Sequence, residues 1–256
     1  MSRFNPYEEN GGSILAIAGQ DFSVIAGDTR QSLNYSIQTR YAQKVFPLTS
    51  NAVLAVNGFA ADGKNFVKRV KQRLEWYTAA HKKEMPLKSI ARLIQTMLYA
   101  RRMFPFYVYN ILGGIEEDGT GAVYSFDPVG SYEREACRGA GAAQSLLQPF
   151  LDNQIYFKNQ TLAPGAEPFV PGRLPLNTVL SLVSATERHI EVGDGLEMYV
   201  VLAPGRSADD LTAAEAQQSK DWPKDLTVEE VESLGDEQDE AKAFRVFRLR
   251  RPLKRD

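Results

Sequence analysis

The sequence predicts a single α+β domain, and three observations lead to this class. Short apolar runs bounded by Gly, Asn, Asp or Pro recur along the chain, as expected for strands of antiparallel sheets. Amphipathic helices, with apolar residues at spacings of three and four, follow the first group of strands. The chain has 256 residues, of which 43% are hydrophobic and 24% are charged, which is the composition of an ordinary globular domain.

The first strands are expected to form a hairpin. The apolar runs at 13–18 and 22–26 flank a turn at 19–21, a pattern typical of a β-hairpin. The second run leads directly into Asp28-Thr29-Arg30, which places charge where the sheet opens. Taken alone, an Asp-x-Arg after a strand is more often a turn with an ion pair than part of a site.

The other elements follow in blocks of strands and helices. Residues 1–12 form a polar, extended leader, and 31–43 form a loop with a short strand. Strands are predicted at 44–48, 52–56, 106–112, 121–127, 132–137, 196–203 and 243–249, and helices at 59–77, 87–98, 139–151 and 176–188. Periodicity alone gives an α+β domain and no finer architecture.

Residues 205–241 differ in composition from the rest of the chain. They hold twelve acidic residues against three basic ones, a net charge of −9. We interpret this segment as an exposed, partly disordered insertion. The sequence Thr227-Val-Glu-Glu resembles a capping box and predicts a short helix inside it.

Composition excludes several classes of protein. The net charge is −2, so no global charge points to nucleic acid or to an anionic membrane. The basic residues on the two predicted helices after residue 59 are interpreted as solvated faces. Cys137 is the one cysteine, so an intrachain disulfide is impossible, which suits a reducing compartment. No apolar run reaches the roughly 18 residues of a membrane span, and the N-terminus lacks the apolar region of a signal peptide.

The opening hairpin with its Asp-x-Arg resembles that of proteasome beta-type subunits, which belong to the N-terminal-nucleophile hydrolase class. Longer stretches resemble the sixth, non-catalytic beta type of the eukaryotic 20S core particle. They are FNPYEENGG at 4–12, FAADG at 59–63, AVYSFDPVGSYERE at 122–135, PFLDNQ at 149–154 and SATERHIEVGDGLE at 184–197. The resemblance implies a four-layer αββα sandwich, two antiparallel sheets flanked by helices, from residue 13 to the end. It does not account for the acidic insertion.

In active members of this family, an N-terminal threonine hydroxyl attacks the peptide carbonyl. A lysine and the chain's own α-amine handle the proton, and a backbone N–H binds the oxyanion. The resemblance places three retained positions in this chain: Asp28 after the second strand, Lys44 sixteen residues later, and Gly58 at the oxyanion hole. Asp28 and Lys44 can equally form a buried ion pair that fixes the hairpin.

The remaining positions of the family's site are substituted. Gly12 stands at the nucleophile, Ala140 replaces a serine in a Gly-Ser-Gly turn, and His189 and Val192 replace the Asp and Ser after the fourth helix. The resemblance therefore implies a non-catalytic subunit whose leader is not removed by autolysis at Gly12.

Two alternatives belong to other classes. One is an active hydrolase that uses Ser13, or Cys137, as its nucleophile. Ser13 is one residue out of register, which in a strand turns its side chain to the other face, and Cys137 is more readily a buried, inert thiol. The other is a free-standing interaction module that acts through the acidic insertion.

The resemblance also implies partners. The subunit would lie between the fifth and seventh beta types, on the alpha ring and against the opposite beta ring, in the cytoplasm and nucleus. Asp127 and Ser131 would line the substrate pocket of the fifth type, although residues 127–130 also form a good β-turn. No cofactor is required. A structural Mg²⁺ would use the backbone carbonyls of Thr186, His189 and Val192.

Overall fold

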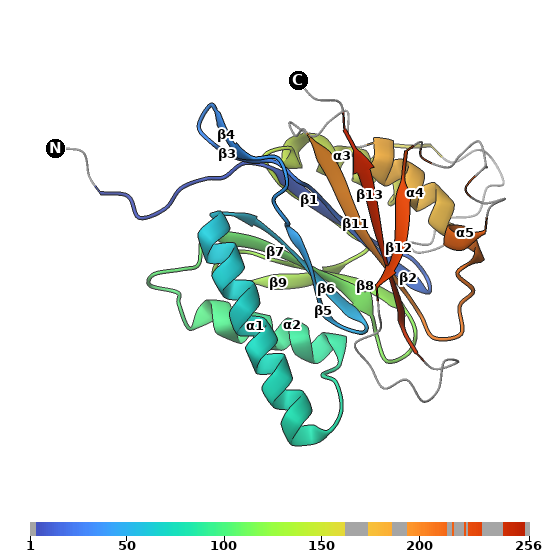
Figure 1. The fold of residues 1–256 in the computed structure, drawn as a ribbon, viewed down its shortest axis with the longest axis horizontal. Coiled ribbons are helices and arrows are strands. Elements are labelled where there is room, and N and C mark those ends of the chain that lie inside the picture. Colours follow the sequence, from blue (N-terminus) through green and yellow to red (C-terminus); the bar gives the residue numbers. More distant parts are fainter. Residues whose placement is uncertain are drawn as a thin grey trace.

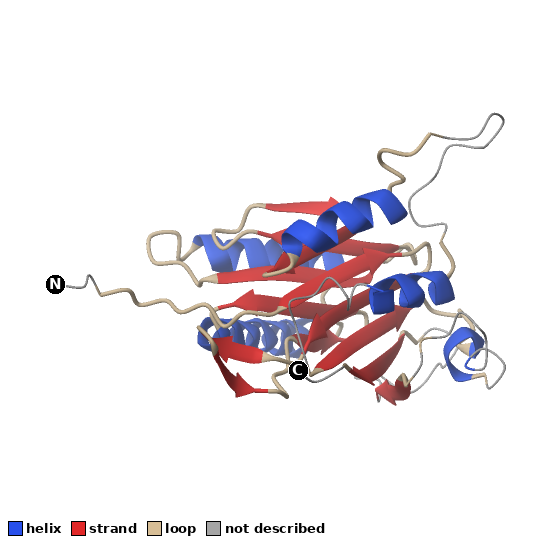
Figure 2. Cartoon of the chain, turned by 90° about the horizontal axis from the view of Figure 1, so that it is seen from above, coloured by secondary structure: helices blue, strands red, loops and turns tan. Residues whose placement is uncertain are grey.

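The computed structural model describes residues 4–161, 174–185, 194–213, 217, 223, 225–231 and 243–253. Two antiparallel sheets lie face to face, and helices cover both outer faces (Figures 1 and 2). The predicted four-layer sandwich is therefore confirmed. The described helices include none that is long and apolar enough to cross a membrane.

The first sheet has six strands in the order β10-β1-β2-β11-β13-β12. Neighbouring strands all pair antiparallel. The strands are β1 (Ser13–Ala18), β2 (Phe22–Asp28), β10 (Cys137–Gly141), β11 (Gly195–Leu202), β12 (Thr227–Val231) and β13 (Arg245–Pro252).

The second sheet has five strands in the order β5-β6-β7-β8-β9, again antiparallel. A separate hairpin is formed by β3 (Gln31–Leu33) and β4 (Ser36–Thr39). The strands of the second sheet are β5 (Val45–Thr49), β6 (Ala52–Gly58), β7 (Val108–Ile115), β8 (Gly121–Phe126) and β9 (Tyr132–Glu135).

Three apolar clusters hold the layers together. Helices α1 (Ala60–His81) and α2 (Leu87–Tyr99) pack on the second sheet, and α3 (Gln144–Gln154) and α4 (Leu176–Ala185) pack on the first. A third cluster lies between the two sheets. Along β1 the side chains alternate between clusters, because Ile14 faces the other sheet and Leu15 faces the helices. A short helix, α5 (Asp209–Thr212), follows β11.

The predicted strand at 132–137 is two strands in different sheets. The chain leaves the second sheet after Glu135 and enters the first at Cys137. Ala136 lies at the crossing, where its N–H donates to the Tyr156 hydroxyl (2.8 Å) and its carbonyl accepts from Ala18 N (2.7 Å). Both backbone groups thus remain paired while the chain changes sheets.

The helix predicted at 139–151 begins later than expected. Residues 139–141 belong to β10, and α3 starts at Gln144. Gly141 has φ +98°, a conformation that a helix does not contain.

The helix predicted at Thr227 is wrong, because residues 227–231 form strand β12. Val228 packs against the cluster under α3 and α4, whereas Val231 packs against the cluster between the sheets. These two valines lie on opposite faces and extend both clusters past β13. Burial of apolar surface therefore overrides the local capping signal.

Candidate functional site

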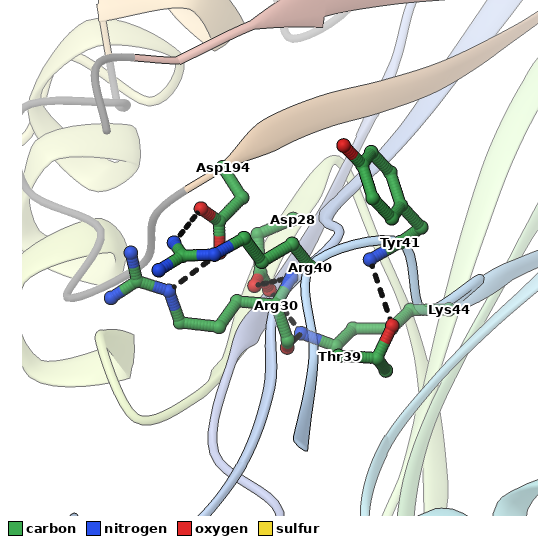
Figure 3. A network of polar contacts seen from close by, with 7 residues as sticks. All are labelled: Asp28, Arg30, Thr39, Arg40, Tyr41, Lys44 and Asp194. Atoms are coloured by element: carbon green, nitrogen blue, oxygen red, sulfur yellow. Dashed lines mark hydrogen bonds and ion pairs between the residues drawn. The ribbon is translucent and has the colours of Figure 1, made fainter. Parts of the chain in front are cut away.

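Asp28 and Lys44 form the centre of the candidate site (Figure 3). Asp28 ends β2, and Lys44 immediately precedes β5, so the two sheets bring them together. Lys44 Nζ donates to Asp28 Oδ1 and to the Arg30 carbonyl, both at 2.5 Å. Asp28 also accepts from the backbone N–H groups of Ser13 (2.8 Å) and Arg30 (2.9 Å). Both side chains are buried.

Burial is the main influence on the protonation of this pair. It raises the pKa of Asp28 and lowers the pKa of Lys44. Their mutual attraction and hydrogen bonding oppose these shifts and favour the charged pair. In an active relative, a lysine with a lowered pKa is suited to accept a proton from a nucleophile. In this chain, Lys44 could play that part only if a nucleophilic side chain lay within hydrogen-bonding distance of its Nζ.

Residue 12 has no side chain to act as a nucleophile, and Lys44 lies against it. Gly12 has φ +79°, and a Cβ built on it would lie 1.9 Å from Lys44 Nζ and 2.7 Å from Asp28 Oδ1. The lysine ammonium thus occupies the space in which any side chain of residue 12 would begin. The retained lysine and aspartate pair with one another across a position that has no side chain.

Ser13 faces away from this pair. Its Oγ accepts a hydrogen bond from Ala143 N (2.9 Å), at the start of α3, and the residue is 1% exposed. The hydroxyl therefore lies on the helix side of the first sheet, whereas Lys44 lies on the opposite side of β1. Cys137 is also buried, and burial raises the pKa of its thiol to about 12, so it remains protonated near neutral pH.

The leader occupies a cleft beside the Asp28–Lys44 pair, between the end of β6 and the β3–β4 hairpin. Asn10 N donates to the Gly58 carbonyl (3.2 Å), and Ser32 N donates to the Asn10 carbonyl (3.0 Å). The Asn10 side chain accepts from Ala60 N (2.7 Å). Residue 10 is therefore bonded to both edges of the cleft, as a bound extended peptide would be. The cavity that remains, lined by Asn10, Lys44 and Gly58 among others, measures about 30 Å³, room for only one or two water molecules.

The backbone conformation at Gly58 favours glycine, and Ala140 lies in the apolar core. Gly58 has φ +116°, and an added Cβ would lie 2.6 Å from the Tyr107 carbonyl. Ala140 pairs with Ile14 and packs in the cluster between the sheets, so no hydroxyl is available at its position.

Thr186, His189 and Val192 lie outside the described residues. Among the residues that are described, no group of three His, Cys, Asp or Glu side chains could hold a metal ion.

A second ion network adjoins the pair, and sequence reasoning missed it. Arg30 Nε donates to Asp194 Oδ2 (2.9 Å), and Arg40 pairs with Asp194 Oδ1 (Figure 3). The Asp194 side chain is buried. Burial acts to raise the pKa of Asp194, but the two arginines outweigh it and lower that pKa. The signal was present, since Arg30 of the Asp-x-Arg needed an acidic partner and Asp194 lies in the quoted stretch at 184–197.

Asp127 and Ser131 lie at the rim of a different cavity. Asp127 Oδ1 accepts from the backbone N–H groups of Val129 (3.0 Å) and Ser131 (2.7 Å), so the carboxylate caps its own turn. Both residues line an open cavity of about 240 Å³, together with Tyr109, Ser125 and Arg138 among others. The turn interpretation and the pocket interpretation are thus compatible.

Comparison with known proteins identifies the family. A family model described as proteasome subunit matches residues 8–167. Proteasome subunit beta type-6 of Saccharomyces cerevisiae is 55% identical over 212 residues, covering 79% of this chain and 88% of the yeast protein. Probable proteasome subunit beta type-6 of Schizosaccharomyces pombe is 42% identical over 212 residues, covering 80% and 94%. Proteasome subunit beta type-1 of Danio rerio is 44% identical over 203 residues, covering 79% and 85%.

The layers, the hairpin and the retained Asp28 and Lys44 define a chain of the N-terminal-nucleophile hydrolase type. The chain belongs to the proteasome subunit family. The relatives' names confirm the predicted resemblance to proteasome beta-type subunits and, for the two yeasts, to the sixth type.

Proposed function

We propose that this chain is a non-catalytic beta subunit of a 20S proteasome core, required for ring assembly in ubiquitin-dependent protein degradation. One observation carries the proposal: the space for a side chain on residue 12 is filled by the ammonium group of Lys44. Without a hydroxyl or thiol there, the lysine has no proton to accept and no covalent intermediate can form.

The leader supports the same conclusion. Residues 10–12 are bonded within the fold through Gly58, Ser32 and Asn57, whose Nδ2 donates to the Gly11 carbonyl (3.0 Å). Ala142 N donates to the Gly12 carbonyl (2.9 Å). Removal of the leader through residue 12 would lose all of these bonds, and removal through residue 11 would keep only the bond to the Gly12 carbonyl.

The proposed partners are the other alpha and beta subunits. The ring neighbours are the fifth and seventh beta types, with the alpha ring on one side and the opposite beta ring on the other. Polypeptide substrates would meet this subunit only through the neighbouring pocket, at Asp127 and Ser131. The location of Asp127 at the rim of an open cavity favours this role, because a carboxylate there can discriminate charge on a peptide.

The role needs no cofactor, and Mg²⁺ at the carbonyls of Thr186, His189 and Val192 stays a prediction about residues outside the described part of the chain. Cytoplasm and nucleus are the proposed locations, without nucleic-acid or membrane partners.

The experiment that tests the proposal is native mass spectrometry of the tagged chain, purified from its own cells without crosslinking. We expect the tag in a large particle that contains many different proteasome subunits. A free-standing hydrolase or interaction module would instead be recovered as a species close to the 28.5 kDa of the chain, and that result would overturn the proposal.

A further inference from the structure

The β3–β4 hairpin lies beside the leader and belongs to neither of the two main sheets (Figure 1). It is a two-stranded sheet of its own. Every residue of its two strands is half-buried or exposed, so the hairpin buries little apolar surface. A two-stranded hairpin by itself is at best marginally stable in water. The position of this hairpin therefore depends on its contacts with other parts of the chain.

The leader residue Asn10 provides such contacts. Ser32 N donates to the Asn10 carbonyl (3.0 Å), and Asn10 Nδ2 donates to the Ser32 carbonyl (3.3 Å) and to Gln38 Oε1 (3.4 Å). Gln38 Oε1 also accepts from Gln31 Nε2 (2.7 Å), so Asn10 is linked to both strands of the hairpin. A Cβ built on Gly11 would lie 2.7 Å from Ser32 Oγ, which shows that the leader backbone packs directly against β3.

The other polar groups of Asn10 bind the opposite wall of the cleft. Its backbone N–H donates to the Gly58 carbonyl at the end of β6 (3.2 Å), and its Oδ1 accepts from Ala60 N (2.7 Å). Ala60 is the first residue of α1, where the backbone N–H groups have no partner inside the helix. The N-cap residue Phe59 has no side-chain oxygen and makes no capping bond. The leader therefore supplies a cap that the helix itself lacks.

Asn10 thus bridges the two walls of the cleft with a single side chain. Its Oδ1 is bound to α1 and its Nδ2 to the hairpin, and the residue is 5% exposed, so loss of either bond would leave a buried polar group unpaired. Gln31 of the hairpin lines the remaining cavity together with Lys44. The leader has a second attachment at Tyr7, whose hydroxyl donates to the Pro105 carbonyl (2.8 Å).

We infer that the β3–β4 hairpin is a lid over the cleft and that the leader, through the Asn10 amide, is the strap that holds this lid closed. Displacement of Asn10 would let the hairpin move away from β6 and would open a path to Lys44. The inference does not depend on the proposed role in assembly, because every contact that supports it lies within this chain.

Amide hydrogen exchange of the full chain, purified from its own cells, tests the strap. The variant is Asn10→Ala, and the matched control is Asn5→Ala, because Asn5 is an exposed asparagine of the same leader with a local bond to Tyr7 N (3.2 Å). We expect the amides of residues 31–39 to exchange about tenfold faster in Asn10→Ala and at the wild-type rate in Asn5→Ala. Wild-type exchange of these amides in Asn10→Ala would overturn the inference.

Asn10→Asp separates the two halves of the bridge and serves also if Asn10→Ala fails to fold. The aspartate keeps an oxygen for Ala60 N but cannot donate to Ser32 or Gln38. We expect faster exchange in residues 31–39 and unchanged exchange at the start of α1. Unchanged exchange in both places would show that the Nδ2 bonds do not hold the hairpin.

Acylation of Lys44 by acetic anhydride, measured by peptide mass spectrometry, tests the lid. Lys44 is buried in the closed cleft, so its modification reports opening. We expect Lys44 to react several-fold faster in Asn10→Ala than in wild type or Asn5→Ala, while the exposed Lys64 of α1 reacts equally in all three. Faster exchange in the hairpin without faster acylation of Lys44 would mean that the hairpin does not cover the cleft, and it would contradict the assignment of a lid.

Discussion

At residue 12, the backbone conformation and the position of Lys44 both favour glycine. The backbone is left-handed, and Lys44 Nζ stands where a Cβ would be. Gly119 offers a matched comparison, because it has φ +82° but nothing within 4 Å of its built Cβ.

Gly12→Ala should therefore cost more stability than Gly119→Ala. We expect about 1 kcal/mol for Gly119→Ala, from backbone strain alone, and about 2–4 kcal/mol for Gly12→Ala, from strain plus displacement of Lys44. Urea unfolding of each variant measures the difference. Equal losses would show that Lys44 yields freely and that residue 12 has room for a side chain.

The Asp28–Lys44 pair should depend on both partners. Lys44→Met leaves Asp28 buried without its counter-charge, which costs about 3–5 kcal/mol. The double variant Asp28→Asn/Lys44→Met removes both charges, keeps an oxygen for the Ser13 and Arg30 N–H groups, and should recover part of that loss. A double-mutant cycle from chemical denaturation measures the coupling, and additive losses would argue against a buried pair.

Asp194 should make stability fall in acid. Its pKa is lowered in the folded state, so its contribution is fully present above the unfolded value of about 4 and is lost as the pH falls through the folded value. Asp194→Asn should lower stability at pH 7 by about 1–3 kcal/mol, since Arg30 and Arg40 lose a charged acceptor. The variant should also lose less on going from pH 7 to pH 3 than the wild type does. If the variant lost as much stability as the wild type between pH 7 and pH 3, Asp194 would not be the source of the acid sensitivity.

At the scale of elements, β12 shows how part of the acidic insertion joins the fold. It adds a sixth strand beside β13, with Val228 and Val231 packed on opposite faces and the Glu229 side chain exposed. Val228→Asp should release the strand, because a carboxylate cannot replace apolar contact with the cluster under α3 and α4.

Amide hydrogen exchange measures that release. We expect the β13 amides that bond to β12 to exchange more than tenfold faster in Val228→Asp, a change of about 1.4 kcal/mol or more. Glu229→Ala, at an exposed position of the same strand, is the matched control and should leave exchange unchanged. Slow exchange in Val228→Asp would mean that β12 contributes little to the sheet.

The elements that the sequence predicts well are those with a strong local pattern. The hairpin of β1 and β2 and the two helices α1 and α2 have clear periodicity, and their bounds differ from expectation by only a few residues. The wrong predictions fall where tertiary contacts, and not the local sequence, determine the secondary structure. The crossing at Ala136 and the strand β12 depend on which sheet needs another strand, and no local signal carries that information.

In the candidate site too, some residues could be predicted from the sequence and others depend on tertiary contacts. Asp28, Lys44 and Gly58 could be found from spacing because the family resemblance fixes their order along the chain. The ion pairs of Asp194 with Arg30 and Arg40 join segments that lie far apart in sequence. The close approach between Lys44 Nζ and a Cβ built on Gly12 depends on where the fold places Lys44. Spacing predicts neither.

At the scale of the whole particle, the charge of Asp127 should influence a neighbour's activity. Asp127→Asn keeps an oxygen to cap the turn at Val129 and Ser131 but removes the negative charge. We expect the neighbouring site to change its relative kcat/KM for lysine-bearing against glutamate-bearing peptides by roughly threefold to tenfold, in favour of glutamate. Ser131→Ala is the uncharged control. An unchanged ratio would mean that Asp127 serves only its turn.

The proposal that this subunit is non-catalytic is best tested by intact-mass and N-terminal analysis of the subunit from purified core particle, after treatment with a tagged epoxyketone or vinyl-sulfone inhibitor. We expect an unlabelled chain that still carries Gly12 and at least part of the leader, beside labelled catalytic subunits in the same sample. A chain that begins at Ser13 and carries the label would show that the off-register serine reacts, and it would contradict the proposed function.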